Sequence, residues 1–189
     1  MFKRRSVRHI CVPATILIMI LTMVLTLSIA GCKGKREKVA VVNEEEAAPK
    51  VAMTLKMGDP KASAQLLSGF YTVENGSWRW TSGKFSVMLR PPANGPQAGA
   101  TLKFTFAAPE VVMTKIAPVT LTASIGVTKL KSETYKEPGN YTYAVDVPAT
   151  LLAGEAVKVD FALDKSLPPG GADKRELALI AISVAFEAK

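Results

Sequence analysis

The sequence predicts an all-β protein whose folded part is a single antiparallel β-sandwich of about eight or nine strands. From Phe70 onward, hydrophobic and polar residues alternate with the period of two that half-buried strands require. Turn sequences such as "EPGN" and "LPPGGAD" separate these runs, and no helical period of useful length lies between them. A signal peptide, a flexible tether and one short helix are expected to precede the sandwich.

The first segment has the pattern of a secretory signal peptide. "MFKRRSVRH" holds four basic residues and no acidic one, and "ICVPATILIMILTMVLTLSIAG" then carries no charge before Cys32. An alternative is that the apolar run from Ile10 to Ala30 remains as an uncleaved anchor, because ~20 apolar residues cross a bilayer. Both interpretations place residue 33 and all that follow outside the cytoplasm.

The sequence "LSIAGC" resembles the lipobox of bacterial lipoproteins. The resemblance implies that residues 1–31 are a lipoprotein signal peptide, that the thiol of Cys32 is lipidated, and that the new amino terminus is acylated, with palmitate as a typical chain. Several acyl chains on one residue would hold the protein stably in the membrane. It further implies a place in the bacterial cell envelope, and, because Lys33 rather than aspartate follows the cysteine, in the outer membrane of a diderm cell.

Residues 32–58 are predicted to be the lipid-anchored tether, because they show no sustained period. Their basic cluster, "KGKREK", would either contact anionic head groups or remain solvated beside the membrane. Residues 59–68 are predicted to form the short helix, with Asp59 as the N-cap, Pro60 in its first turn and Gly69 closing it in the left-handed conformation.

Residues 69–189 are predicted to be the sandwich domain. Its alternating runs are "KFSVMLR", "TLKFTFA", "VTLTASI", "YTYAVDV" and "VKVDFAL", each with one apolar face. The last run, from Leu177 to Phe186, is apolar on both faces. We therefore expect it to be a central strand that is covered on both sides, in part by the short helix.

Composition excludes several kinds of chemistry. The single histidine, His9, and one of the two cysteines, Cys11, lie in the predicted signal peptide, and Cys32 is the lipidation site. The mature domain therefore has no catalytic triad with histidine, no thiolate or imidazole metal site, and no disulfide. Four of the 24 basic residues leave with the signal, so 20 basic residues face 16 acidic ones in the mature chain. This modest charge, on an exported protein, argues against nucleic acid as a partner.

An enzyme that uses only carboxylates would remain possible. The acids near predicted strand ends are Glu74, Asp146, Asp164 and Asp173, and none stands in a recognisable catalytic motif. No loop has an acidic cluster of the D-x-D type for calcium. The sequence thus predicts no catalysis, no metal and no cofactor.

The segments "GFYTVE...WRWT", "LRPP" and "DKRELAL" together resemble jelly-roll domains with a galactose-binding-like fold, found in bacterial surface and glycan-associated proteins. The resemblance covers about residues 69–186. It implies a jelly-roll-like, non-catalytic module that in some relatives binds carbohydrate.

The segment "WRWT" also supplies candidate binding residues. In an extended strand Trp78 and Trp80 point to one face and Arg79 to the other. We expect at least one ring to be core, the alternative being a stacking platform for a ligand. The candidate ligand-binding residues are Glu74, Trp78, Arg79, Trp80, Asp173 and Arg175. We expect the charged members to lie together, either as a ligand site at the rim or as a salt-bridge network that ties the first strands to the last.

Two functions follow from these observations. The first is a lipid-anchored, non-catalytic envelope module that binds a glycan or another envelope component through its long end loops, "PPANGPQAG" and "KSLPPGGADKRE". The second is an envelope scaffold or assembly subunit that docks to a protein partner. In both, the membrane is a partner through the acyl chains on Cys32.

Overall fold

The computed structural model describes residues 50–189. The predicted signal peptide, Cys32 and most of the predicted tether lie outside the described residues. Strands dominate the described part, which confirms the prediction of an all-β antiparallel sandwich. The strands are β1 (Thr54–Lys56), β2 (Leu66–Glu74), β3 (Trp78–Leu89), β4 (Ala100–Ala108), β5 (Val119–Ile125), β6 (Thr128–Lys129), β7 (Glu133–Tyr135), β8 (Gly139–Val147), β9 (Val157–Leu163) and β10 (Ile180–Ala188).

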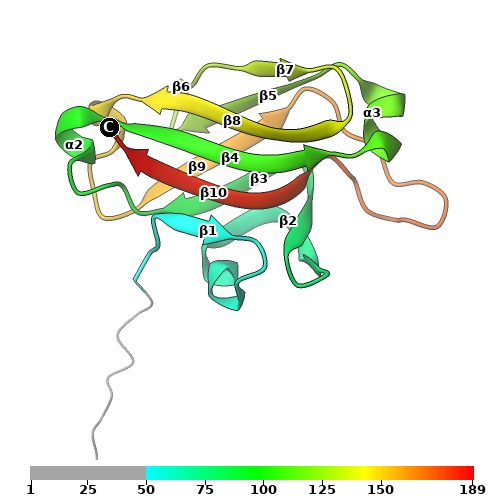
Figure 1. Cartoon of the computed structure of the whole chain (residues 1–189), viewed down its shortest axis with the longest axis horizontal. Coiled ribbons are helices and arrows are strands. Elements are labelled where there is room, and N and C mark those ends of the chain that lie inside the picture. The colour runs from blue at the N-terminus through cyan, green and yellow to red at the C-terminus, as the bar shows by residue number, and fades with distance from the viewer. Residues whose placement is uncertain (1–49) are drawn as a thin grey trace, which may run out of the picture. The chain divides into compact units, whose positions relative to one another are not determined.

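All strand pairs are antiparallel, and the strands run in the order β6-β5-β9-β3-β10-β4-β8, with β1 on β10, β2 on β3 and β7 on β5. Figure 1 shows β10, β4 and β8 as one layer, with β9 and β5 in the layer behind it. β3 belongs to both layers, because Arg79 and Trp80 pair with β10 whereas residues 84–89 pair with β9. The sheet therefore curls around one main core.

A glycine sits where β3 passes from one layer to the other. A Cβ atom at Gly83 would lie 2.8 Å from the Glu176 carboxylate and 2.9 Å from the Ser166 hydroxyl. The Gly83 amide instead donates to Glu176 Oε1 at 3.2 Å, and Ser166 bonds to the same oxygen. The missing side chain thus lets the loop before β10 pack directly on the bend.

The residues predicted to face inward fill the core. The members with at most 4 % exposure are Phe85, Val87, Leu89, Leu102, Phe104, Phe106, Val119, Leu121, Ala123, Tyr143, Val145, Val147, Val159 and Phe161. Phe85 stacks on Phe161 with ring centroids 4.9 Å apart, which joins the two layers. Full burial of each such side chain contributes roughly 1.5–3 kcal/mol, so this core can stabilise a domain without disulfides.

β10 is central, as predicted, because it lies between β3 and β4. It begins at Ile180, later than expected, and Leu177–Leu179 precede it with bonds to Leu167 and Thr81. The short helix packs mainly on β2 and β3 rather than over β10. β1 pairs along one edge of β10, with Leu55 opposite Val184. The prediction that both faces of β10 are covered is wrong, because Ile182 is 37 % exposed.

The predicted boundary between tether and domain at residue 58 is wrong. β1 already belongs to the sheet, and from Thr54 to Met57 exposed Thr54 and Lys56 alternate with buried Leu55 and Met57. An alternation over so few residues is indistinguishable from chance in a sequence. The partner of β1 is β10, at the other end of the domain's sequence, so local pattern does not reveal the pairing either. The folded part therefore begins before Thr54.

The predicted helix at 59–68 is also shorter than expected. It is a 3-10 helix, η1 (Pro60–Gln65), and Asp59 caps it as predicted by accepting from the Lys61 amide at 2.9 Å. Leu66 starts β2 instead of continuing the helix. Gly69 does have a positive φ of 75°, but it lies inside β2 at an irregularity of the pairing with β3.

Three short helical segments lie between the strands, where the sequence shows no helical period of useful length: α2 (Gly95–Ala98), α3 (Glu110–Ile116) and η2 (Ala149–Leu151). α3 buries Val112 and Met113 against the sheet end. Two turns of helix are too few to show a period in the sequence. None of the helices among residues 50–189 has the length and apolar character needed to cross a bilayer.

Candidate functional site

The two tryptophans lie side by side on one face of β3, as the spacing predicts. Their rings meet edge to face with centroids 6.4 Å apart. Trp80 is only 9 % exposed, and Trp78 is partly buried. They belong to a small apolar cluster apart from the main core; its members are Tyr71, Trp78, Trp80, Val112, Ile116, Leu167, Leu177 and Ile180. Trp80 is therefore core, as expected for at least one ring, and Trp78 sits at the margin of the cluster.

Arg79 points to the opposite face, but no acid meets it. Its Nε donates to the Met57 carbonyl at 3.0 Å, and its terminal nitrogens donate to the Tyr71 carbonyl at 3.1 Å and the Ser63 hydroxyl at 3.0 Å. Within residues 50–189 no ion pair includes Arg79. The expectation that Glu74 and Asp173 lie beside Arg79 is wrong, because three oxygens of β2, η1 and the segment after β1 already surround its guanidinium.

The acids gather around Arg175 instead. Arg175 makes ion pairs of 2.9 Å with both Glu74 and Asp173, and a second nitrogen, Nε, also donates to Asp173 at 3.0 Å. Its guanidinium lies 5.3 Å from the centre of the Tyr71 ring. The predicted grouping of Glu74, Asp173 and Arg175 is therefore present, and it joins the end of β2 to the loop before β10.

This cluster is built for fixed charge rather than proton transfer. The hydrogen bonds from Arg175 hold the pKa of Asp173 below its ordinary value, and the same bonds, with those to Glu74, raise the pKa of Arg175. A general acid at neutral pH needs a raised pKa, so Asp173 is unsuited to that role. Among residues 50–189, no group of three acids could hold a metal ion.

The other two acids considered from the sequence have structural partners. Asp164 accepts from the Thr120 amide at 2.7 Å, and Asp146 pairs with Lys189 at 3.0 Å. Neither lies in the cluster around Arg175.

A hollow of about 390 Å³ opens beside the Arg175 cluster. Its lining combines charged side chains with an apolar floor and a loop of prolines and glycines; the members are Lys115, Leu167, Pro168, Pro169, Gly170, Gly171, Asp173, Arg175 and Leu177. We call this region, together with Tyr71, Glu74 and Trp78, the loop end. Sequence reasoning missed Lys115 and Tyr71. The one signal for Lys115 is the four-residue spacing of Val112 and Ile116, which is that of one apolar helix face.

No protein-family model matches this sequence, and no curated protein matches it either. Among solved structures, it is similar to a carbohydrate-binding module described as specific for mannan, with 9 % identity, a TM-score of 0.41, and coverage of 74 % of this chain and 98 % of that one. It is also similar to a structure described under the name CBM4, with 15 % identity, a TM-score of 0.35, and coverage of 79 % and 94 %. Likenesses of this size establish no ligand for this chain.

Proposed function

We propose that the protein is a non-catalytic binding module, anchored in the bacterial cell envelope by acyl chains on Cys32, and that its loop end binds a glycan. The anchoring half rests on "LSIAGC" and on the charge pattern of the first 31 residues. The binding half rests on one observation: the hollow at the loop end joins an apolar floor to a charged cluster that keeps unused hydrogen-bonding capacity.

The hydrogen-bonding capacity that remains unused can be counted at Arg175. A guanidinium carries five N–H donors. Nε and both terminal nitrogens bond to Asp173 or Glu74, which leaves one hydrogen on each terminal nitrogen. The two carboxylates also keep lone pairs. Donors and acceptors thus stand next to each other on a rigid frame, which is what vicinal sugar hydroxyls need.

The apolar part of the site complements a sugar's C–H face. Leu167 and Leu177 line the hollow, and both belong to the cluster that contains Trp78. Trp78, which is partly buried, packs in the same apolar cluster without lining the hollow, and so supports this apolar surface from behind. Small-ligand sites commonly combine such a surface with a few fixed polar groups.

A glycan array probed with the mature chain tests the binding half. We expect a hit whose affinity falls about tenfold in Asp173→Asn, because a charged acceptor is lost. The matched control is Glu187→Gln, which breaks the exposed Lys103–Glu187 pair of 2.7 Å away from the loop end and should bind normally. An equal loss in both variants, or no glycan hit at all, would contradict glycan binding at this site.

The anchoring half has its own test. Cys32→Ser should leave an unprocessed precursor that incorporates no labelled fatty acid. Normal processing and normal detergent partitioning of this variant would show that the lipobox interpretation is wrong.

A docking role for a protein partner is the second candidate, and one observation favours it. Among the described residues β8 pairs along its whole length with β4 and with no other strand, which leaves one edge of residues 139–147 open. Open edges are sites where a partner strand can add. A protein that co-purifies with the wild type but not with Thr142→Pro would support this role.

A further inference from the structure

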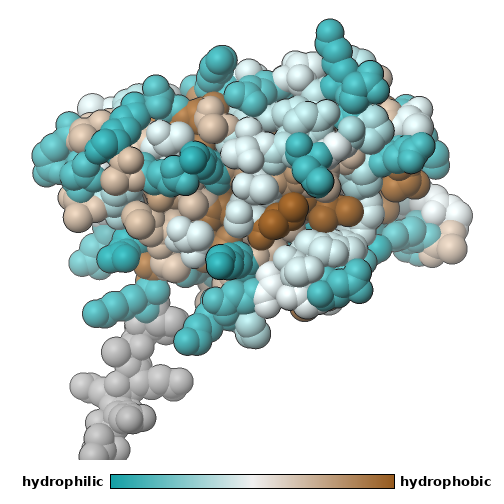
Figure 2. All heavy atoms as spheres, in the orientation of Figure 1, coloured by the Kyte–Doolittle hydropathy of each residue, from teal (hydrophilic) through white to brown (hydrophobic). Residues whose placement is uncertain are grey.

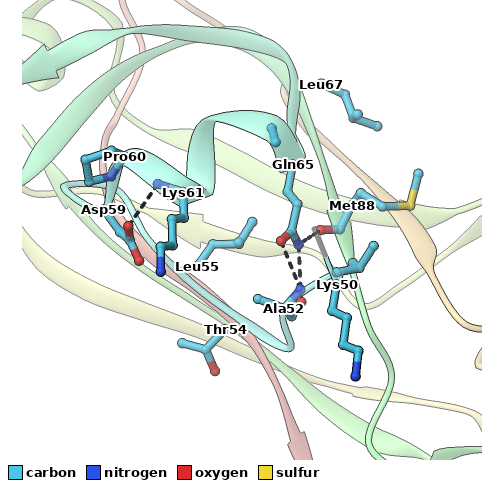
Figure 3. A pocket seen from close by; sticks show the side chains of 13 residues that line it. Lys50, Ala52, Thr54, Leu55, Asp59, Pro60, Lys61, Gln65, Leu67 and Met88 are labelled. Carbon is cyan, nitrogen blue, oxygen red and sulfur yellow. Dashed lines mark hydrogen bonds between the residues drawn. The ribbon is translucent and has the colours of Figure 1, made fainter. Parts of the chain in front are cut away.

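A second hollow lies on the β1 side of the domain, with a volume of about 750 Å³. Its walls come from the segment before β1, from η1, and from the start of β2; the lining residues are Lys50, Val51, Ala52, Thr54, Leu55, Asp59, Pro60, Lys61, Ala62, Ala64, Gln65, Leu67 and Met88. We call it the η1 groove, and Figure 3 shows it from close by. A volume of this size lies in the range of small-molecule sites.

The buried amide of the groove, on Gln65, is not free to bind a ligand. Gln65 is 9 % exposed, and its amide is fully engaged. Its oxygen accepts from the Ala52 amide at 2.9 Å, and its nitrogen donates to the carbonyls of Ala52 at 3.2 Å and Met88 at 2.7 Å (Figure 3). What remains to contact a ligand is aliphatic, from Leu55, Leu67 and Met88. A sugar would lose hydrogen bonds there, whereas a hydrocarbon chain would not.

The rim of the groove is basic. Lys50 and Lys61 lie at the rim, and Lys56 follows on β1; all three are exposed. The acid at the rim, Asp59, caps η1 through the Lys61 amide. Leu67, 45 % exposed, adds an apolar side chain beside them. Lysines around an aliphatic surface fit the two parts of an anionic phospholipid.

The position of the groove along the chain points to the same occupant. Lys50, at its rim, is separated from Cys32 by residues 33–49. A segment of that length reaches at most roughly 60 Å. An acylated Cys32 would therefore keep the groove within reach of a bilayer surface at all times, so that even weak affinity for lipid would act at high effective concentration.

We propose that the η1 groove docks the domain on anionic phospholipid, with an acyl chain against Leu55, Leu67 and Met88 and the head-group phosphate at Lys50 and Lys61. The proposal rests on the anchoring half of the proposed function for its setting, but not on glycan binding. Docking would fix the domain's orientation and direct other faces away from the lipid.

The absence of cysteine after Cys32 permits a direct test with single labels. Leu67→Cys carries an environment-sensitive fluorophore at the groove, and Val127→Cys carries it at the fully exposed β5–β6 turn. The mature chain is placed on phosphatidylcholine vesicles with and without phosphatidylglycerol, some bearing an acyl-chain nitroxide quencher. We expect a blue shift and quenching at position 67 with the anionic vesicles, and neither at position 127. Equal signals at both positions, or none at position 67, would overturn the proposal.

Charge variants in the Leu67→Cys background show whether the rim lysines act specifically. Lys50→Gln with Lys61→Gln should weaken the partition of unacylated chain onto anionic vesicles by roughly 30-fold, since each lysine near such a surface contributes about 1 kcal/mol. The matched control, Lys129→Gln with Lys131→Gln, removes equal charge from exposed positions around β6 and should change it far less. Equal weakening by both pairs would mean general attraction by charge and would overturn a specific groove.

Two further outcomes separate this proposal from the proposed function. Trp78 belongs to the loop end and Trp80 packs in the same apolar cluster, so glycan binding read from tryptophan fluorescence should persist in the groove variants. If wild-type Cys32 reacts with the label, the anchoring half fails. The groove is still tested then, because the unacylated chain from residue 32 with Cys32→Ser should show the position 67 shift on added anionic vesicles, and its absence would overturn docking.

Discussion

The loop end and the η1 groove are both hollows on the same small sandwich, yet their chemistry is opposite. At the loop end, Arg175 is held by two carboxylates and keeps N–H groups free for a ligand. In the groove, every polar atom of the Gln65 side-chain amide is used by backbone groups, and aliphatic surface remains. The kind of ligand a hollow can take therefore depends less on which polar residues line it than on how much of their hydrogen-bonding capacity the fold already uses.

The surface of the domain is also divided, in part, into charged and apolar regions. Figure 2 shows hydrophilic residues scattered over the visible face, with hydrophobic residues gathered in a central strip where Figure 1 draws β10 and β2. Ile182, on β10, is 37 % exposed, and it lines a smaller hollow together with Lys56 and Gly58. That hollow shares Asp59 with the η1 groove. Apolar surface and lysines thus continue beyond the groove along the same side of β1.

The largest expected effect comes from removing the amide that closes the groove floor. Gln65→Ala would leave the partly buried Ala52 amide and Met88 carbonyl without their partner, and each loss costs about 1–3 kcal/mol. We expect the free energy of unfolding, measured in urea, to fall by about 3 kcal/mol. Gln97→Ala, on the exposed face of α2, is the control and should change it by less than about 0.5 kcal/mol. A fall of similar size in both variants would mean that Gln65 does not hold the segment before β1.

Arg79→Ala comes next. Its three bonds to Met57, Tyr71 and Ser63 join the η1 region to β2, so we expect a loss of about 2 kcal/mol in unfolding free energy. Glycan affinity at the loop end should be unchanged, because Arg79 points to the opposite face. Arg90→Ala, at an exposed position after β3, serves as the control. Normal stability combined with lost glycan binding would reverse the assignment of Arg79 as structural.

The contrast between Arg79 and Arg175 also marks the limit of what the sequence can predict. Alternation correctly placed Trp78, Arg79 and Trp80 on two faces of one strand, because a period of two is a local property. Which arginine meets the acids is not local. Arg175 and Glu74 are 101 residues apart in the chain, and only the return of the loop before β10 to the end of β2 brings them together.

The same reasoning explains the elements that were predicted and those that were not. Strands such as residues 157–163 bury every second side chain over seven residues, so the pattern exceeds chance. β1 has only three residues, too few to show the two-residue period of a strand. α3 has seven residues, which is only two turns of a helix and too few to show its 3.6-residue period. Both elements are fixed by contacts across the domain. The η1 groove is lined by residues of β1 and of the six-residue η1, both too short to show a period, and therefore no sequence pattern predicted it.

The smallest expected effect is the pH dependence of the loop-end ion pairs, and it separates a structural cluster from a ligand site. The pKa of Asp173 is lower in the folded protein than its ordinary 3.8, so its pairing with Arg175 stabilises the fold above that value and is lost as the pH falls through the folded pKa. The difference in unfolding free energy between the wild type and Asp173→Asn should therefore be constant near neutral pH and shrink toward zero in acid. It should also shrink in high salt, because the Asp173 side chain is 39 % exposed and surface pairs are screened. If this difference exceeds that of Arg79→Ala and does not depend on salt, the cluster is chiefly structural, and the case for a glycan at the loop end weakens accordingly.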